Sequence, residues 1–247
     1  MKKRRKRSKR APAAATLAEV PFRELVQKDP ELRELREHYA NQSARNRRAA
    51  AEFALGSSQA SMLMAQATGD RGWVHPSWHD AAEPLAIDPD YPAAILPVAS
   101  IEYQYGRPEE AMVLFLKLTT FPSDTEDLVE IIDKAGDFLI DQDDLHNAEE
   151  LYAAAVAAHP DVAVFHVGLG YCAAQLGRFD EALVHHRRAV ELEPDNYLHL
   201  NDLGYSLIEV GDYDEAEAVL RRAVQLAPPD YDLARGNLEH LQTLRPR

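Results

Sequence analysis

Three aspartates, Asp133, Asp137 and Asp141, are spaced four residues apart in the segment DKAGDFLID. On an α-helix this spacing places the three carboxylates on one face, where neighbouring like charges repel by roughly 0.3 kcal/mol per pair. A row of carboxylates is suited to binding a cationic ligand, such as a segment rich in Lys and Arg. The alternative is a solvated acidic helix face without a partner. Which of the two applies depends on the helices that hold these residues and on the face that they present.

Other reactive side chains do not assemble into a catalytic or metal-binding pattern. His75 and His79 have the spacing of a helical zinc pair. However, Pro76 lies between them and no cysteine or pair of carboxylates completes a ligand set, so packing of Trp73 and Trp78 against the helices that follow is the alternative. The adjacent His185 and His186 point to different faces of a helix. Cys172 has no basic neighbour and is expected to be a buried small side chain. We therefore predict a protein that is not an enzyme and uses no cofactor and no metal.

Charge is distributed unevenly along the chain. The formal net charge is −14, yet the first ten residues, MKKRRKRSKR, contain eight Lys and Arg and no acid. Such a run is typical of segments that bind nucleic acid or an anionic membrane. The alternatives are a solvated extension and docking onto the acidic remainder of the chain. No apolar run approaches the roughly 20 residues of a membrane span, and no signal-peptide core follows the basic run. These features predict a cytoplasmic protein, or a nuclear one in a eukaryote.

The chain repeats itself at an interval of 34 residues. GRFDEALVHHRRAVELEP begins at Gly177, and GDYDEAEAVLRRAVQLAP begins at Gly211. Segments 163–196 and 197–230 align without a gap, 129–162 is in register with them, and a fourth copy occupies 92–126. A fixed period of this length is typical of stacked repeat architectures.

Each copy is predicted to be a helix–turn–helix. In 163–196, VAVFHVGLGYCAAQLG has apolar residues at helical spacing and ends at Gly177. The next segment opens with acids, which favour a helix N-terminus, and ends before Pro194. One such hairpin cannot bury its apolar face alone, so stacked copies share a core. Small residues recur where the two helices must approach closely: Gly170, Ala182, Ala189, Gly204, Ala216 and Ala223.

These residues resemble the tetratricopeptide-repeat (TPR) family over about 140 of the 247 residues. The resemblance implies an all-α fold, a right-handed superhelical solenoid of helix–turn–helix repeats with a helical N-terminal extension. The four repeats are 92–126, 129–162, 163–196 and 197–230, and 231–247 is then a C-terminal capping helix. In the copy 129–162, Asp143 stands at the turn where other copies have Gly, which predicts a different angle between the two helices of that copy.

The N-terminal third is predicted to be helical but less regular. Residues 1–15 form a disordered basic tail, and 16–91 form a helical region. Asp29 and Pro30 are a good helix start, from which a mixed-charge helix continues to Gly56. Residues 58–91 are a degenerate repeat or an irregular entry segment, because a second helix there would have to contain Pro84.

In the TPR family the first helix of each repeat lines a concave groove that holds an extended peptide. Carried over by position, the resemblance implies eight partner-binding residues: Tyr103, Asp133, Asp137, Asp141, Tyr171, Gln175, Asn201 and Tyr205. Some members grip the C-terminal carboxylate of chaperones with Lys, Arg and Asn. The matching positions here hold Asp133, Asp137, Val167 and Asn201, so this positive clamp is absent.

We therefore expect an adaptor or co-chaperone-like scaffold that binds another protein or peptide, rich in Lys and Arg, in an acidic, tyrosine-containing groove. The alternative is a nucleic-acid- or membrane-associated factor that attaches through residues 1–10, with the repeats recruiting a partner.

Overall fold

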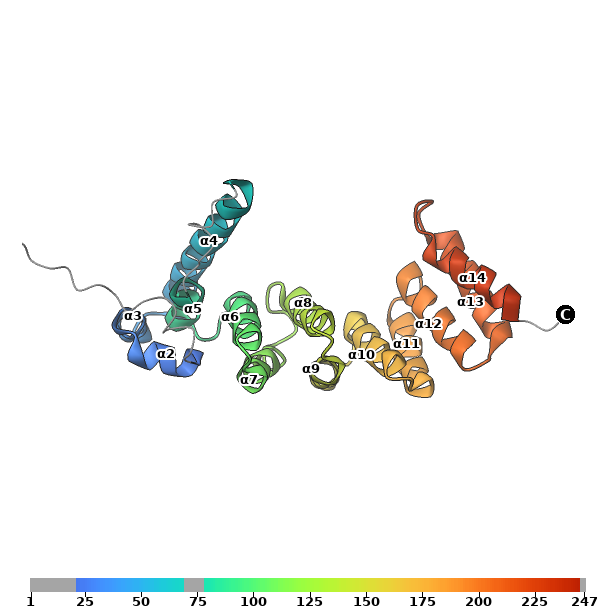
Figure 1. Ribbon diagram of the computed structural model, residues 1–247, viewed down its shortest axis with the longest axis horizontal. Helices are drawn as coiled ribbons and strands as arrows, with labels where there is room; N and C mark the ends of the chain where they lie inside the picture. The colour runs from blue at the N-terminus through green and yellow to red at the C-terminus, as the bar shows by residue number, and fades with distance from the viewer. Residues whose placement is uncertain (1–20, 69–77, 245–247) are drawn as a thin grey trace, which may run out of the picture. The chain divides into compact units, whose positions relative to one another are not determined.

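The computed structural model describes residues 21–68 and 78–244, and every regular element within them is an α-helix (Figure 1). The all-α prediction is confirmed for these residues. The chain divides between Leu114 and Phe115 into two compact units, here called the N-terminal and C-terminal units. The division falls inside the segment 92–126. The basic segment 1–15, His75 and the side chain of His79 lie outside what is described.

The N-terminal unit contains six helices or parts of helices in its described residues: α2 (Phe22–Lys28), α3 (Pro30–Ala40), α4 (Ala44–Thr68), α5 (Trp78–Ile87), α6 (Pro92–Gln104) and the start of α7 (Pro108–Leu118). The predicted start at Asp29 is confirmed, because its carboxylate accepts hydrogen bonds from the backbone N–H groups of Glu31 and Leu32. Pro30 follows at the first helical position, where its missing N–H costs nothing.

Two expectations for this unit were wrong. The helix that starts at Pro30 does not continue to Gly56. It ends at Ala40, and α4 begins at Ala44 with the Ser43 hydroxyl accepting from the backbone N–H of Asn46. Asn and Ser favour helix ends over helix interiors, because their side chains compete for backbone hydrogen bonds. Pro84 does not prevent a helix: it is a buried residue within α5, and burial of Ala81, Ala82, Leu85, Ala86 and Ile87 offsets its lost hydrogen bond.

A buried carboxylate fixes the beginning of the described chain. Glu102 of α6 is 1% exposed, and it accepts hydrogen bonds from the backbone N–H of Phe22 and from Nε of Arg107. A buried charge is tolerated when it is paired and hydrogen-bonded. The contact holds the N-terminus of α2 against α6.

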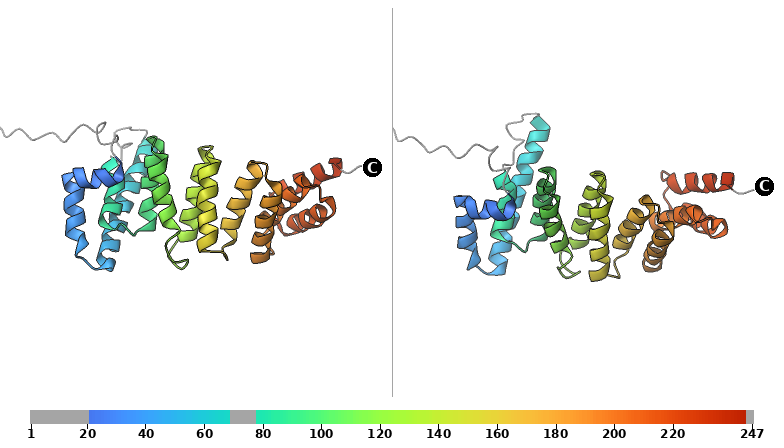
Figure 2. Two further views of the ribbon diagram at one scale, coloured as in Figure 1. Left: turned by 90° about the horizontal axis from the view of Figure 1, so that it is seen from below. Right: turned by 60° about the horizontal axis from the view of Figure 1, so that its bottom comes forward.

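The C-terminal unit continues as antiparallel helix pairs that follow one another in chain order (Figure 1, Figure 2). Each pair is joined by a turn of three residues, and one further helix follows the last pair. The helices are α8 (Leu128–Asp141) with α9 (Leu145–Ala158), α10 (Ala163–Gln175) with α11 (Phe179–Leu192), α12 (Tyr197–Glu209) with α13 (Tyr213–Leu226), and α14 (Leu233–Leu244).

The turns within these pairs share one backbone conformation. Gly177 and Gly211 have φ angles of 74° and 82°, and Asp143 has a φ of 61° at the equivalent position. Positive φ is normally left to glycine, although Asp is among the residues that tolerate it. The substitution at Asp143 therefore preserves the turn that the glycines make in the other copies.

The close approach predicted at small residues is confirmed. A Cβ atom on Gly170 would lie 2.4 Å from the His186 ring, and one on Gly204 would lie 2.5 Å from the Leu220 side chain. The four paired alanines, Ala182, Ala189, Ala216 and Ala223, are fully buried.

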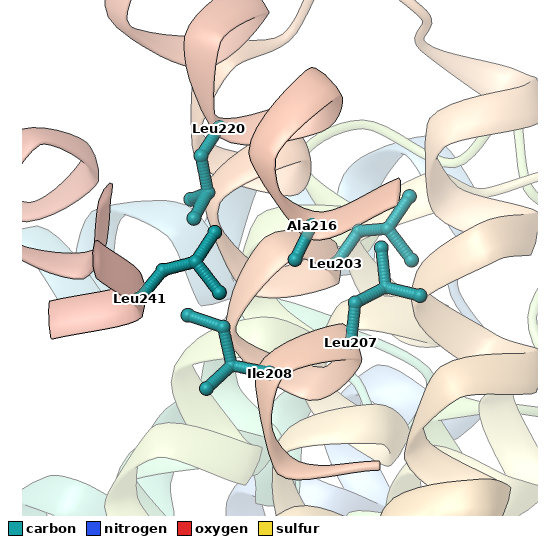
Figure 3. Packing of buried hydrophobic residues seen from close by; sticks show 6 residues of the cluster. All are labelled: Leu203, Leu207, Ile208, Ala216, Leu220 and Leu241. Atoms are coloured by element: carbon teal, nitrogen blue, oxygen red, sulfur yellow. The ribbon is translucent and has the colours of Figure 1, made fainter. Parts of the chain in front are cut away.

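The last helix, α14, packs against the final pair. Figure 3 shows Leu241 of α14 directed at Leu220 and Ile208, beside Leu203 and Leu207. Leu241 and Ala234 are fully buried. Leu241 and Ala234 lie 34 positions after Leu207 and Leu200 of α12. The helix α14 therefore has the sequence pattern of the first helix of a further repeat.

Candidate functional site

The first helices of the three complete pairs in the C-terminal unit carry exposed polar and aromatic side chains at equivalent positions. α10 contacts both α8 and α12. Residues 34 positions apart occupy the same place in successive helices and therefore share a face. Two such sets are exposed, and we call their six members the first-helix face: Asp137, Tyr171 and Tyr205, with Asp141, Gln175 and Glu209.

The carboxylates of α8 repel one another, as their spacing predicts. Asp137 and Asp141 are exposed, and Asp133 is half-buried one turn earlier. Burial, with a further contribution from Asp137, raises the pKa of Asp133. Burial and the charge of Asp141 raise the pKa of Asp137 in the same way. Both carboxyls are therefore sites where a nearby cation would relieve an unfavourable charge.

The position of Asp133 is set from inside the unit. The hydroxyl of the buried Tyr152, on α9, lies 3.1 Å from Oδ1 of Asp133 and donates to it. The Tyr152 ring occupies the space left by two glycines, because a Cβ on Gly136 would lie 2.2 Å from the ring and one on Gly168 would lie 2.3 Å from it. The two glycines thus let one aromatic side chain contact both α8 and α10.

The tyrosines of the face are partly exposed. Tyr171 of α10 is 41% exposed and Tyr205 of α12 is 39% exposed. Burial, followed by the charge of Glu209 and a hydrogen bond to it, raises the pKa of Tyr205. Tyrosine combines a rigid apolar ring with a polar tip, a combination enriched at protein interfaces. Gln175, one turn beyond Tyr171, is exposed as well.

Three of the eight expected residues do not join this face, one of which is the half-buried Asp133 described above. Asn201 is only 6% exposed, and its carboxamide oxygen accepts a hydrogen bond of 2.9 Å from Asn237 of α14. The final helix therefore covers Asn201, which the expectation of an open groove did not anticipate. Tyr103 is a half-buried residue of α6 in the N-terminal unit, whereas the other seven belong to the C-terminal unit.

Sequence reasoning missed two polar clusters. One is the Glu102–Arg107 pair in the N-terminal unit. The other is a group of histidines between α10, α11 and α12, in which His186 Nδ1 lies 2.8 Å from Ser206 Oγ. The expected divergence of the His185 and His186 rings is confirmed, since His185 contacts His166 instead. Aligning the copies position by position would have revealed the histidines.

The predicted burial of Cys172 is confirmed, although a basic neighbour, Arg178, also acts on its thiol. Cys172 is fully buried, and burial together with the charge of Glu149 raises the pKa of its thiol to about 12. Among the side chains that the structure describes, in 21–56 and 81–244, no group of three His, Cys, Asp or Glu is placed to hold a metal ion. Across 21–68 and 78–244, no helix is both long and apolar enough to cross a membrane.

Two family models described as tetratricopeptide repeat match residues 134–185 and 173–238. No curated protein matches the sequence. Solved structures with a similar fold include the TPR domain of Sgt2 from Aspergillus fumigatus, at 16% identity over 49% of this chain and 80% of that one, with a TM-score of 0.44. A thermophilic TPR protein of Thermus thermophilus is 22% identical over 76% of this chain and 100% of its own, with a TM-score of 0.46. The first TPR domain of Spaghetti (RPAP3), bound to an HSP90 peptide, is 18% identical over 47% of this chain and 90% of its own, with a TM-score of 0.44.

Proposed function

We propose that this chain, whose residues 134–238 match the tetratricopeptide-repeat family, is a protein-interaction adaptor whose first-helix face binds a basic segment of a partner protein. The observation that carries the proposal is the combination of unpaired carboxylates and half-exposed tyrosines at equivalent positions of α8, α10 and α12. Asp137 and Asp141 form no ion pair with any other described residue, whereas Glu130 on the same helix is paired with Lys134 at 2.5 Å.

The chemistry of the face favours Lys and Arg over other side chains. The row on α8 offers carboxylates at successive helical turns, and Glu209 adds a further carboxylate beside Tyr205. A guanidinium can stack on a tyrosine ring while it pairs with a carboxylate. Binding of a cation also offsets the repulsion between Asp133, Asp137 and Asp141. Such an interaction is steered by charge and weakens with salt.

The test uses a synthetic peptide, MKKRRKRSKR, titrated into the full chain at low and high salt. Replacing Asp137 and Asp141 with Asn removes two charges from the face. A matched control, Glu150→Gln with Asp180→Asn, removes two charges from exposed positions on the second helices α9 and α11. We expect the first variant to lose about tenfold or more in affinity and the control to lose about twofold or less. If both variants lost peptide affinity equally, the interaction would depend only on the net charge of the protein, and the first-helix face would be rejected as the site.

The tyrosines are tested separately. Tyr171→Ala and Tyr205→Ala leave every charge in place, so a loss of peptide affinity at high salt reports the aromatic contribution. A peptide affinity that these changes leave untouched would exclude the two tyrosines from the proposed site.

A second function is favoured by one specific observation, the eight Lys and Arg among residues 1–10. These residues would attach the protein to nucleic acid or to an anionic membrane, while the repeats recruit a partner. Salt-dependent retention on DNA or on vesicles containing phosphatidylserine, lost when residues 1–10 are deleted, would support it. Retention that survives the deletion would count against it.

A further inference from the structure

The copy 163–196 has histidines at interior positions where its neighbours have apolar side chains. His166 corresponds to Ile132 and Leu200, and all three residues are buried. His185 is half-buried and corresponds to Leu151 and Val219. These helix pairs therefore fold with Ile, Leu and Val in place of the two histidines.

The same substitution occurs at two further positions. His186, 3% exposed, corresponds to Tyr152 and Leu220. His199 of α12, 7% exposed, corresponds to Phe165. We call the four residues the histidine core: His166, His185, His186 and His199. Packing alone does not account for them, because the neighbouring copies pack without them.

The contact between His166 and His185 has room for one proton between the two Nδ1 atoms, so it requires that one of the two rings be neutral. Their Nδ1 atoms are 3.3 Å apart, and the His166 Nε2 atom lies 3.0 Å from the carbonyl oxygen of Pro160. Because the carbonyl oxygen can only accept, the proton of neutral His166 is on Nε2, and its Nδ1 accepts from Nδ1–H of His185. Only when both rings are doubly protonated do two N–H donors meet face to face across this 3.3 Å distance, which would break the contact between α10 and α11.

His186 has even less room for a second proton. Its Nδ1 is hydrogen-bonded to Ser206 of α12, and its ring fills the space above Gly170 of α10. Its Nε2 atom is buried and has no hydrogen-bond partner among the described residues. An imidazolium carries a donor on both nitrogens, so protonation would place a charged N–H group in this buried space, where the ring now forms no hydrogen bond through Nε2.

The charged and titratable groups around the histidine core do not remove this penalty. His186 faces His185 on its own helix, and His199 and Asp202 from α12. Burial, and then the neighbouring His185, lowers the pKa of His186 to about 4, with the backbone of Val167 and Asp202 acting in the opposite direction.

The remaining neighbours act on His185 and His199. Burial and His166 lower the pKa of His185, against the opposing charge of Glu181. Arg178 is paired with Glu181, and Arg187 is paired with Glu215 of α13. Glu193 lies 3.0 Å from Nε2 of His199.

We propose that the histidine core is an acid-sensitive switch, in which protonation of His186, and of both rings of the His166–His185 pair, loosens the packing of α11 on α10 and α12 as the pH falls below neutrality. Because α10 and α12 carry Tyr171 and Tyr205, the switch would also weaken partner binding. That consequence rests on the proposed function, whereas the opening itself does not.

The direction of the pH effect on opening depends on which state, folded or open, binds more protons. An exposed histidine titrates near pH 6.5, and the folded core holds His186 neutral to a lower pH. The open state therefore binds more protons, and opening becomes more favourable as the pH falls from about 6.5 towards 4. For His186 alone, the equilibrium constant for opening should rise roughly 20-fold between pH 7 and pH 5.

Amide hydrogen exchange on the full chain, at pH 7 and pH 5 and corrected for intrinsic exchange rates, measures this constant directly. We expect protection in α10, α11 and α12 to fall roughly 20-fold. The α8–α9 pair is an internal control, since it holds Ile132, Leu151 and Tyr152 at these positions. The raised pKa values of Asp133 and Asp137 strengthen that pair in acid instead.

The matched variant takes its side chains from the copy 197–230. It combines His166→Leu, His185→Val and His186→Leu with Ser206→Ala, which removes the hydroxyl left without a partner. The pH dependence in α10–α12 should then largely disappear. A variant that keeps the full pH dependence would overturn the proposal, as would equal losses of protection in α8–α9 and α10–α12 of the natural chain. An NMR titration of the natural chain tests the proposal even if the variant does not fold. A His186 ring that titrates near pH 6.5 would exclude the switch.

Discussion

The Tyr152 hydroxyl donates a 3.1 Å hydrogen bond to Oδ1 of Asp133. This bond connects the interior of the C-terminal unit to the helical turn that precedes Asp137 of the first-helix face. The tyrosine reaches this position because Gly136 and Gly168 leave space for its ring. The placement of the aspartates on α8 therefore depends on residues that no partner would touch. In this unit, the exposed chemistry and the packing beneath it are coupled.

Replacing Gly136 with Ala should destabilise the C-terminal unit by about 1–3 kcal/mol, because the added Cβ would overlap a fully enclosed ring. The free energy of unfolding from urea denaturation of the full chain measures the effect. Gly236→Ala in α14 is the control, since its Cβ would meet nothing within 4 Å. In that helix interior the exchange should stabilise by about 0.5–1 kcal/mol. If both changes were stabilising, the Tyr152 ring would not be enclosed as described.

Asp143→Gly should stabilise the pair α8–α9 by about 1 kcal/mol, because Asp143 has a φ of 61° in a turn where Gly177 and Gly211 have 74° and 82°. Asp143→Ala is the informative comparison, since it removes the same charge and keeps the Cβ atom. Urea denaturation should therefore rank the glycine variant above the natural chain and the alanine variant below it. An equal gain for glycine and alanine would assign the effect to charge.

Much of the C-terminal unit was predictable because its signals are local and repeated. The 34-residue interval predicted the helix pairs, and the small residues predicted where the two helices touch, as Gly170 and Gly204 show. The aspartates at 133, 137 and 141 could be placed on one helix face from their spacing alone. Such features depend on residues close in the chain and recur in each copy.

The errors arose where distant segments decide the outcome. Asn201 was expected on an open groove, yet Asn237 of α14 covers it. Pro84 was expected to disfavour a regular second helix in 58–91, yet burial of the surrounding apolar residues maintains α5. The helix predicted to run to Gly56 is interrupted, and the Ser43 hydroxyl accepts from Asn46 at the start of α4. Tertiary contacts override local preference in the first two cases, and a helix-end signal was overlooked in the third.

Glu102→Gln should destabilise the N-terminal unit by about 3–5 kcal/mol, because it removes the buried carboxylate from its ion pair with the half-buried Arg107. The carboxylate is 1% exposed and also accepts from the backbone N–H of Phe22. The control is Asp195→Asn, which breaks the ion pair between Asp195 and Arg222. The side chain of Asp195 is 77% exposed and that of Arg222 is 50% exposed. Exposed pairs contribute little, so this change should cost about 0.5 kcal/mol or less. Similar costs for the two variants would mean that solvent reaches Glu102.

Leu241→Ala should cost about 3 kcal/mol, because the side chain is fully buried against Leu220 and Ile208 and its loss leaves a cavity (Figure 3). Leu233→Ala, on the same helix, is the control, since Leu233 is 65% exposed and its loss should cost about 0.5 kcal/mol or less. Detachment of α14 would also expose Asn201. Hydrogen exchange should therefore show reduced protection in α12 together with α14 in the Leu241 variant. If α12 kept its protection while α14 lost it, α14 would not be needed to complete the unit.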